Sequence, residues 1–501
     1  MALYQIVAEW TTYLTFYLLC AVFIAFVGYC LYVWHIHQKY DHIPGPPRDN
    51  FLLGHIPTFR REMNSDRVIH DRFLEWTEKY GPVYRINTFH TVSLVVSCPE
   101  ATKILMSPKY SKDPLAYKRI FHLFGLRFLG NGLVTAVDHD TWYKQRRIMD
   151  PAFSSSYLRG LMDTFNERAE CLMQHLEVIA EERTIANMHR MVNCVTLDVI
   201  CKVAFGVDLD LLKHPDSPFP NAIDLCLQGM IQDIRDPFFR HSPWNRKKVR
   251  EIQEAVKLLR TTGAKWINQR RKAVENAEDV PKDILTKILK TADGEENHEV
   301  MLDNFVTFFI AGQETTASQL SFAIMELGRH PEILKRTKEE VDEVLGTRRD
   351  VLYEDLGKLT YLTQVLKETL RLYPPAVGTS RWIHEDTVIS GFKIPGSYLL
   401  LYLPLKYDFF FFFFFFFFFF FFFFFLLLLL LLLFYYPFSL GPRSCLGQTF
   451  SQMEAKVVLT KFLQRFDFSL VPGQSFDIKD TGSLRPRSGV LCTIKHCRKY
   501  G

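Results

Sequence analysis

A run of uncharged residues near the N-terminus, from Trp10 to Trp34, limits the possible folds of this chain more than any other feature. As an α-helix, this run is long enough to cross the hydrocarbon core of a bilayer, which is about 30 Å thick. Glu9 precedes the run, and the residues that follow it include His35, His37, Lys39 and Arg48. The positive-inside rule therefore predicts a cytosolic domain behind an uncleaved membrane anchor over residues 1–36. The alternative is a cleaved signal peptide, which ordinarily has a basic start and a shorter apolar region.

The chain behind this anchor has the size and composition of a large folded domain. The whole chain, anchor included, has 501 residues, of which 48% are hydrophobic, and this is ample for a sizeable core. A net charge of +5 is too small to suggest a nucleic-acid partner. Ten cysteines are scattered without a zinc-type or disulfide-type spacing, which favours a reducing compartment. We predict a hinge over residues 37–50 and one catalytic domain over residues 51–501.

Periodicity in this domain predicts mainly helices with a small β region. Residues 83–86 and 92–97 are rich in β-branched residues and are predicted strands, and strands return near residues 382–394. Apolar residues recur at helical spacing over residues 161–179, 186–205, 249–276 and 304–329. The prolines of residues 43–47 predict a stiff, extended spacer in the hinge, and a plain linker is the alternative.

One cysteine carries more functional information than any other residue. Phe438, Gly441, Arg443, Cys445 and Gly447 fit the pattern F-x-x-G-x-R-x-C-x-G at all five specified positions. Glycines allow the backbone to come close to the sulfur where a side chain would clash, and backbone N–H groups can temper the charge of a metal-bound thiolate. The alternative for a single cysteine is a buried structural thiol.

This pattern resembles the haem-binding loop of the cytochromes P450. The resemblance implies a mainly α P450 fold behind a transmembrane helix, with haem b held by the Cys445 thiolate and Arg443 paired with a haem propionate. Residues 43–47 resemble the proline-rich hinge of microsomal members. We therefore expect a single-pass protein of the endoplasmic reticulum membrane.

A second motif lies in the middle of the predicted helix 304–329. Ala311, Gly312, Glu314 and Thr315 resemble the oxygen-activating helix of the family. The resemblance implies that Gly312 thins the helix next to the haem, and that Thr315 and Glu314 act catalytically by delivering protons. An acid and an alcohol within an apolar helix are costly unless they are used, and a satisfied core contact is the alternative.

Two further motifs belong to the same resemblance. Glu368 and Arg371 form an E-x-x-R, which taken alone is a surface ion pair of small value. In the family this pair is buried and braces the core around the haem loop. Trp142 and Arg146 resemble a W-x-x-x-R pair that meets a haem propionate, and Arg381 fits a second propionate ligand.

The source of electrons is predicted to be a second protein. No G-x-G-x-x-G follows a predicted strand, so the chain shows no nicotinamide site of its own. The resemblance implies that NADPH–cytochrome P450 reductase, with its FAD and FMN, supplies the electrons. Lys144 and Arg147 are predicted on the face that meets this partner, and solvated surface charge is an equal alternative.

The sequence departs from the family over residues 409–433. Residues 409–425 are an unbroken run of Phe and residues 426–433 an unbroken run of Leu, where the family has a segment with an Arg that completes a triad with Glu368 and Arg371. Our hypothesis is a sequence error, because TTC and CTT are two frames of one trinucleotide repeat. The alternative is a second transmembrane helix.

Within the family, long stretches such as residues 302–312 and 366–375 are most similar to members that hydroxylate the side chain of cholesterol at C24. The implied substrate is a sterol. Phe121, Leu123, Phe124 and Ala311 are candidate pocket residues, with ordinary core as the alternative for the first three. Val377 replaces a bulky aromatic residue and puts the site of attack in doubt. The other hypotheses are a hydroxylase of another lipid, such as a fatty acid, and a non-oxygenating protein, namely a haem-thiolate isomerase or a paralogue without activity.

Overall fold

The computed structural model describes residues 2–65, 67–236, 238–291, 297–396, 398–402 and 436–497. Helices dominate and the sheets are small, which confirms the predicted fold class. The chain divides into two compact units. One comprises Met1–Ala101 with Ile383–Tyr402, and the other comprises Thr102–Trp382 with Leu403–Gly501. The Phe/Leu run over residues 409–433 lies outside the described residues.

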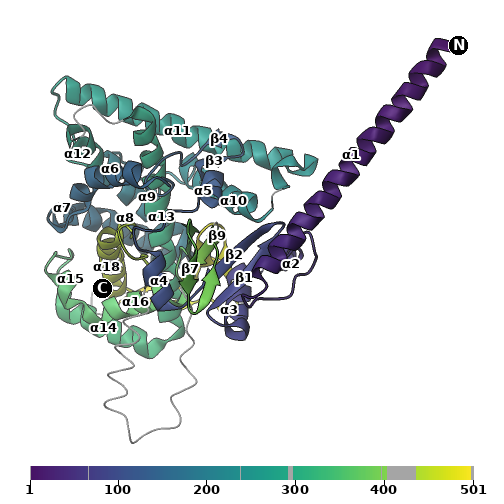
Figure 1. Cartoon of the computed structure of the whole chain (residues 1–501). Helices are drawn as coiled ribbons and strands as arrows, with labels where there is room; N and C mark the ends of the chain where they lie inside the picture. Colours follow the sequence, from purple (N-terminus) through teal and green to yellow (C-terminus); the bar gives the residue numbers. More distant parts are fainter. Residues whose placement is uncertain are drawn as a thin grey trace, which may run out of the picture. The chain divides into compact units, whose positions relative to one another are not determined.

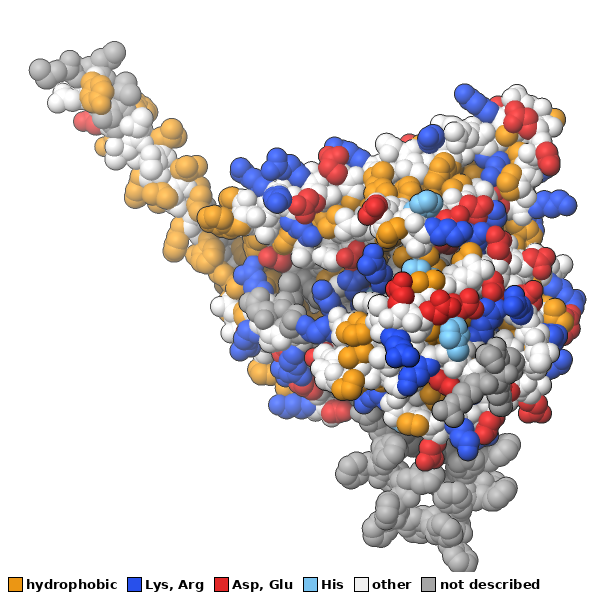
Figure 2. All heavy atoms as spheres, turned by 180° about the vertical axis from the view of Figure 1, so that it is seen from behind, with side chains coloured by type: hydrophobic (Ala, Val, Ile, Leu, Met, Phe, Trp, Pro, Cys, Tyr) orange, Lys and Arg blue, Asp and Glu red, His pale blue; other side chains and the backbone are white. Residues whose placement is uncertain are grey.

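The first unit begins with a single long helix, α1 (Ala2–Tyr40). Within it, Glu9–Tyr40 is long and apolar enough to cross a membrane. Its large side chains are exposed, Phe16 and Phe23 among them, and Figure 2 shows how apolar side chains cover the helix. Because exposed apolar surface of this size is unfavourable in water, α1 fits the predicted membrane anchor. The helix extends past residue 36, the predicted end of that anchor.

The proline-rich segment after α1 packs on the sheet of the first unit. Ile43 is fully buried, and the backbone N–H of Arg85 donates to the carbonyl of Pro44 at 2.8 Å. A Cβ on Gly45 would lie 2.6 Å from the Arg85 carbonyl oxygen, so only glycine permits this close approach. The segment is therefore docked along its length on strand β1.

The sheet of the first unit is built on β1 (Val83–Thr88), β2 (Thr91–Val96) and β9 (Tyr398–Tyr402). β1 and β2 are antiparallel, with Val83 opposite Val96, and β9 pairs with β2 in parallel. Two predicted strands are thereby confirmed. The remaining elements are α2 (Ile56–Asn64), α3 (Ile69–Tyr80), β7 (Thr387–Ile389) and β8 (Phe392–Ile394); α4 (Pro99–Leu105) spans the boundary in sequence.

The second unit is a helical assembly around α13 (His298–Arg329). Figure 1 shows α13 crossing the middle of this unit, where it packs on α9, α11, α16 and α18. The Asn297 side chain accepts from the Glu299 backbone N–H and starts the helix. The rings of Phe205 and Phe305 lie 4.2 Å apart between α9 and α13. This apolar contact and the packing on four helices place α13 at the centre of the core of this unit.

The helices of the second unit confirm the predicted helical segments. They are α5 (Pro114–Phe121), α6 (His139–Met149), α7 (Ser155–Arg159), α8 (Met162–Glu182), α9 (Met188–Phe205), α10 (Pro218–Arg235), α11 (Arg246–Glu275), α12 (Ile284–Thr291), α13, α14 (Pro331–Leu345), α15 (Asp355–Lys358), α16 (Thr360–Leu372) and α18 (Gln448–Arg465), with short 3-10 turns η1 (Asp150–Phe153), η2 (Phe239–His241) and η3 (Pro243–Asn245).

Short strands complete this unit. β13 (Leu491–His496) lies between β10 (Phe466–Leu470) and β5 (Ile185–Asn187), and it is antiparallel to both. Two antiparallel pairs are formed by β11 (Ile478–Asp480) with β12 (Leu484–Pro486), and by β3 (His122–Leu123) with β4 (Leu126–Arg127). β6 (Thr379–Ile383) ends at the boundary of the unit. Strand β12 runs past α13 and carries a side chain to the site described below.

Candidate active site

The cysteine loop of the second unit folds back tightly just before α18. Gly441 has φ +71°, and a Cβ there would lie 2.3 Å from the carbonyl oxygen of Met106, so glycine is required on both counts. The backbone N–H of Cys445 donates to the carbonyl of Phe438 at 2.9 Å and closes the loop. Phe438 itself is half-buried. The loop thus presents Cys445 at a fixed position.

The Cys445 side chain has accessible surface, yet burial raises the pKa of its thiol. A thiol that lines an internal space has accessible surface, and the protein that surrounds this space at longer range still raises the pKa of the thiol. A backbone hydrogen bond from Gly447 and the charge of Arg146 oppose this rise in pKa. A bound metal ion deprotonates a coordinating thiol outright, so the donor is suitable for iron.

Gly447 contributes in a different way from the predicted one. A Cβ at this position would lie 4.0 Å from the Cys445 Sγ, which is ordinary contact. The predicted clash with the sulfur is therefore wrong for Gly447. Its backbone N–H is the useful group, because it stabilises negative charge on the sulfur.

Arg146 and Trp142 on α6 support the loop. The Arg146 Nη1 donates to the carbonyl of Ser444 at 2.8 Å, and its Nε donates to Asp150 Oδ1 at 2.6 Å. These contacts make Arg146 a brace behind Cys445, and its predicted contact with a haem propionate stays a prediction. Trp142 is buried, and the guanidinium of Arg443 lies 4.6 Å from the centre of its ring.

Three cations gather beside the loop without an acidic partner. Lys112 and Arg381 are buried and Arg443 is half-buried, and within the described residues none of them forms an ion pair with an Asp or Glu. The Arg443 guanidinium instead donates to the carbonyl oxygens of Ala136 and Val137. Burial, and then the charges of Arg443 and Arg381, lower the pKa of Lys112; burial and Arg381 lower the pKa of Arg443 to about 10.

This cation cluster, defined as Lys112, Arg381 and Arg443, fits an anionic ligand. Buried charge is costly unless it is compensated, and the two propionates of a haem would supply the missing negative charge. A cavity of about 180 Å³ borders Arg381 and Arg443. Its other lining residues are Met106, Ser107, Pro108, Lys109, Tyr110, Ser111, His139 and Pro442. Thiol donor and cation cluster together fit a haem.

Sequence reasoning missed Lys112. A lysine directly before the Asp113 that caps α5 has the pattern of ordinary surface charge. Its role depends on a backbone bridge to Arg381 and on the neighbouring Tyr117, whose ring centre lies 4.6 Å from the Lys112 Nζ. Only the packing of distant segments brings these groups together.

Helix α13 has an open face at Ala311 and Thr315. Ala311 is exposed and Thr315 half-buried, although most of the helix around them is buried. Residues four apart share a helix face, so the two side chains line the same space. The Thr315 Oγ1 donates to the Ala311 carbonyl at 2.9 Å, which fixes the hydroxyl. An alcohol is thus held at the edge of this open face.

Gly312 serves the packing of α13 on α9. A Cβ at Gly312 would lie 2.7 Å from Cγ1 of Ile200. The predicted reason for this glycine, a thin helix beside the haem, is wrong, because the vacant side faces α9. Glu314 on the same helix is buried, and its Oε2 accepts from Asn193 Nδ2 of α9 at 2.7 Å.

Glu314 has an unusual affinity for protons. Burial raises its pKa to about 7, and Arg485 and the Asn193 hydrogen bond limit the rise. A carboxyl group with this pKa can hold and release a proton near neutral pH. Asn193 and Arg485 were not singled out from the sequence, since both are brought to Glu314 by tertiary packing.

The E-x-x-R pair is more exposed than the family resemblance implied. Arg371 donates to both carboxylate oxygens of Glu368, at 2.8 and 2.7 Å, and the Glu368 side chain is 56% exposed. The prediction of a buried pair is therefore wrong for Glu368. The pair matches the surface ion pair that the motif predicts by itself.

The candidate pocket residues fall into two groups. Leu123 is fully buried, and Phe124 packs on Phe239 with ring centres 5.8 Å apart, so both are core residues here. Phe121 is half-buried, with the Arg127 guanidinium 5.0 Å from its ring centre. Val377 is half-buried in the segment before β6, and Ala311 faces the open side of α13.

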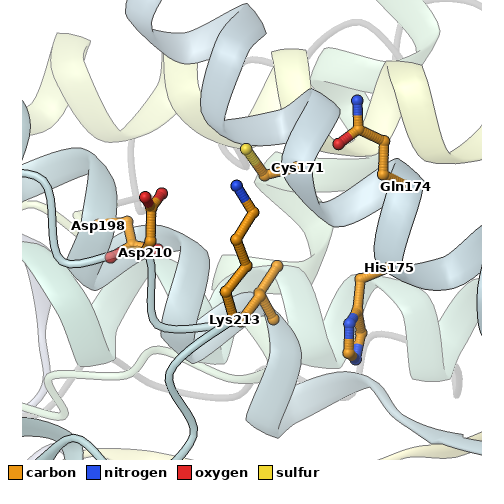
Figure 3. Close-up of a pocket in the computed structure, with 7 residues that line it drawn as sticks. Cys171, Gln174, His175, Asp198, Asp210 and Lys213 are labelled. Carbon is orange, nitrogen blue, oxygen red and sulfur yellow. The ribbon is translucent and has the colours of Figure 1, made fainter.

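A second cavity lies away from these residues. It measures about 160 Å³ and is lined by Cys171, Gln174, His175, Asp198, Asp210, Leu212 and Lys213. Figure 3 shows the Lys213 ammonium extended into the space between Cys171 and Asp210. None of the sequence-predicted site residues lines it. Burial raises the pKa of Asp198 there to about 7.

Comparison with known proteins gives a consistent result. The family model described as Cytochrome P450 matches residues 44–404 and 433–495, so the match leaves out the whole Phe/Leu run except its last residue, Leu433. Cytochrome P450 4d2 of Drosophila melanogaster is 26% identical over 491 residues, which cover 90% of this chain and 93% of that protein. Human Cytochrome P450 4V2 is 27% identical, covering 91% and 90% of the two chains. The chloroplastic carotene epsilon-monooxygenase of Arabidopsis thaliana is 29% identical, covering 84% and 80%.

Proposed function

The chain belongs to the cytochrome P450 family of monooxygenases, and we propose that it hydroxylates a sterol, namely the side chain of cholesterol at C24. The observation that carries the monooxygenase function is the loop that holds the Cys445 thiol beside an uncompensated cation cluster. When bound, a haem supplies the activation of dioxygen and the insertion of one oxygen atom into a C–H bond. The protein has to hold that group, exclude water and deliver protons.

We assign these tasks to separate residues. Cys445 is the iron ligand, with Gly447 and Arg146 stabilising its thiolate. Arg443 and Arg381 pair with the propionates, together with Lys112. Thr315 and Glu314 deliver protons from α13, because one is fixed at the open face and the other has a pKa of about 7. As a test, Thr315→Ala should divert electrons from product into hydrogen peroxide; unchanged coupling would contradict this role.

The sterol proposal rests on sequence resemblance. Residues 302–312 and 366–375 resemble cholesterol 24-hydroxylase, whereas the names of the relatives above indicate no sterol. A hydroxylase of another lipid, such as a fatty acid, is the competing function. Val377 leaves more room than the aromatic residue expected there, so a shifted carbon of attack is one outcome of the test below.

The test uses the full-length protein with haem, in detergent. We expect cholesterol to shift the Soret band by displacing water from the iron, and a long-chain fatty acid to leave it unchanged. Mass spectrometry of the product formed with NADPH–cytochrome P450 reductase then identifies the carbon that is hydroxylated. A shift with the fatty acid alone would transfer the function to the competing class.

We propose that NADPH–cytochrome P450 reductase is the electron donor and that α1 anchors the protein in the endoplasmic reticulum membrane with the catalytic domain in the cytosol. The long apolar helix supports a membrane position. The basic residues after Trp34 support the orientation. Protease protection of tagged termini in sealed microsomes tests it: cleavage of a C-terminal tag by external protease is expected.

We also propose that the Phe/Leu run replaces an ordinary family segment through a sequence error. The gap in the family match over residues 405–432 supports this. Sequencing the transcript across residues 405–437 tests it. An ordinary segment with its Arg is expected, and an intact Phe/Leu run would overturn the hypothesis.

A further inference from the structure

Arg485 on β12 lies between two carboxylates of different helices. Its Nη1 is 2.9 Å from Asp224 Oδ1 on α10 and 3.8 Å from Glu314 Oε1 on α13. The guanidinium is largely buried, with 17% of its side chain exposed. One cation is thus shared between a half-buried and a fully buried carboxylate, and it is nearer to the first.

The sharing leaves Glu314 incompletely satisfied. Its Oε2 accepts from Asn193, but its Oε1 is buried and has no hydrogen-bond partner among the described residues. In the part of the chain that the structure describes, Asp224 Oδ1 also lacks an aligned hydrogen bond, despite the short distance to Arg485. Arg485 is therefore within ion-pair distance of both acids and is locked to neither by a directional bond.

We propose that Arg485, held by Asp224, is a positioning residue that sets whether Glu314 carries a proton. With Arg485 near Asp224, a neutral Glu314 is favoured in its buried position. A guanidinium that moves towards Glu314 favours the carboxylate. The proposal rests on the proposed function, since it names the device that would control proton supply at Thr315.

The charged groups around Glu314 come from three elements. They are Arg485 on β12, Asp224 on α10 and, beside Arg485, His189 on α9. Burial and the nearby Arg485 lower the pKa of His189 to about 3, so it stays neutral at physiological pH. Burial raises the pKa of Glu314 to about 7, Arg485 lowers it and Asp224 raises it further. The two charged neighbours therefore act in opposite directions.

This opposition gives a test that a purely structural role would not pass. Asp224→Asn removes a negative charge and releases Arg485, so the pKa of Glu314 should fall by about one unit or more. Arg485→Gln removes the cation, so the pKa of Glu314 should rise by a similar amount. Arg485→Lys keeps the charge and should stay near the wild-type value.

The measurement is a pH titration of the protonated carboxyl stretch by infrared spectroscopy, assigned by its loss in Glu314→Gln. Arg487→Gln is the matched control, because Arg487 is two residues along the chain and lies 4.0 Å from Asp477. The control should leave the titration unchanged. Shifts of the same sign in Asp224→Asn and Arg485→Gln, or no shift in either, would overturn the proposal.

A second readout separates this proposal from the proposed function. In each variant, the pH dependence of the ratio of product to NADPH consumed should shift in the same direction as the pKa of Glu314. If the carboxyl titration shifts but no substrate is hydroxylated by the wild-type protein, the proposed function fails and the control of Glu314 protonation by Arg485 stands. If hydroxylation proceeds but the Glu314 titration is the same in the variants as in the wild type, only the role of Arg485 is rejected. Should Arg485→Gln not fold, Asp224→Asn and Arg485→Lys carry the test, and an unmoved titration in Asp224→Asn overturns it.

Discussion

Two groups of basic residues in the second unit differ in how their charge is balanced. In the first, Asp303 is fully buried and accepts from Arg127 at 3.0 and 2.6 Å and from Arg260 at 2.8 Å. The backbone N–H of Asn131 donates to the same carboxylate at 2.7 Å. The protein itself thus supplies the anion, and the cluster is satisfied without a ligand.

The second group is the cation cluster beside Cys445. Arg381 donates only to Thr379 and to the carbonyl of Ser380, among the described residues, and no carboxylate compensates it. The cations of the first group are the more exposed, with 33% of the Arg127 side chain and 14% of the Arg260 side chain accessible, whereas Lys112 and Arg381 are buried. The difference teaches that an uncompensated buried charge marks a ligand site, whereas a compensated one marks the framework.

The largest expected effect follows from removing Cys445, the proposed iron ligand beside the cation cluster. Cys445→Ala should abolish turnover, because the iron loses its thiolate. The reduced carbonyl complex should lack the thiolate-type Soret band. Cys171→Ala is the control, since this cysteine lines the second cavity and should leave the band in place. A normal band in Cys445→Ala would place the ligand elsewhere.

The compensated cluster should respond through stability. Asp303→Asn leaves Arg127 and Arg260 without their carboxylate and should lower the free energy of unfolding by about 3 kcal/mol. Urea titration measures this, with and without haem, and the loss should be similar in both. Glu299→Gln is the control, because Glu299 is 52% exposed and its ion pairs should contribute less than about 1 kcal/mol. A small effect for Asp303→Asn would remove the contrast between the clusters.

Removing a charge from the cation cluster should raise the free energy of unfolding, whereas removing Asp303 should lower it. Lys112→Met removes a buried charge without an acidic partner, so the haem-free protein should gain stability, by about 1 kcal/mol. Haem affinity should fall about tenfold, since a charge-assisted contact to a propionate is lost. Haem titration and urea unfolding measure the two effects. Lower stability with unchanged haem affinity would show that Lys112 belongs to the framework.

Local sequence patterns were sufficient to predict the helices and strands named below and the chemical type of the site. Helical periodicity predicted α9 and α13, and β-branched runs predicted β1 and β2, because these signals depend on neighbours along the chain. The spacing around Cys445 predicted the loop, since Gly441 has to adopt a positive φ and admit the Met106 backbone.

Roles that depend on distant contacts could not be predicted. Arg146 braces Ser444 and Gly312 accommodates Ile200, although the motifs indicated the haem for both. A motif gives residue types and spacing, but it does not show which side of a helix meets which neighbour. Arg485 is the extreme case, since nothing near it in sequence indicates a carboxylate on α13.

The smallest expected effect concerns Asp198, a buried acid that is neither fully compensated nor beside the haem site. It accepts from the Leu211 backbone N–H at 3.0 Å, and burial raises its pKa from the ordinary 3.8 to about 7 despite that bond and Arg168. The folded protein therefore retains a proton that the unfolded chain has lost between these two pH values. It follows that the free energy of unfolding decreases as the pH rises through this window and levels off above about 7.

Asp198→Asn removes this titration and should flatten the pH dependence. Relative to wild type, the variant should gain about 1–2 kcal/mol between pH ~5 and pH ~8, less than the full shift because the carboxyl lines a cavity that can hold water. Urea midpoints across this range measure the gain. Glu314 contributes with the same sign, so the difference between variant and wild type isolates Asp198. An equally steep dependence in Asp198→Asn would mean that Asp198 is ionised in the folded protein and that Arg168 compensates it, which would place it with Asp303 among the framework charges.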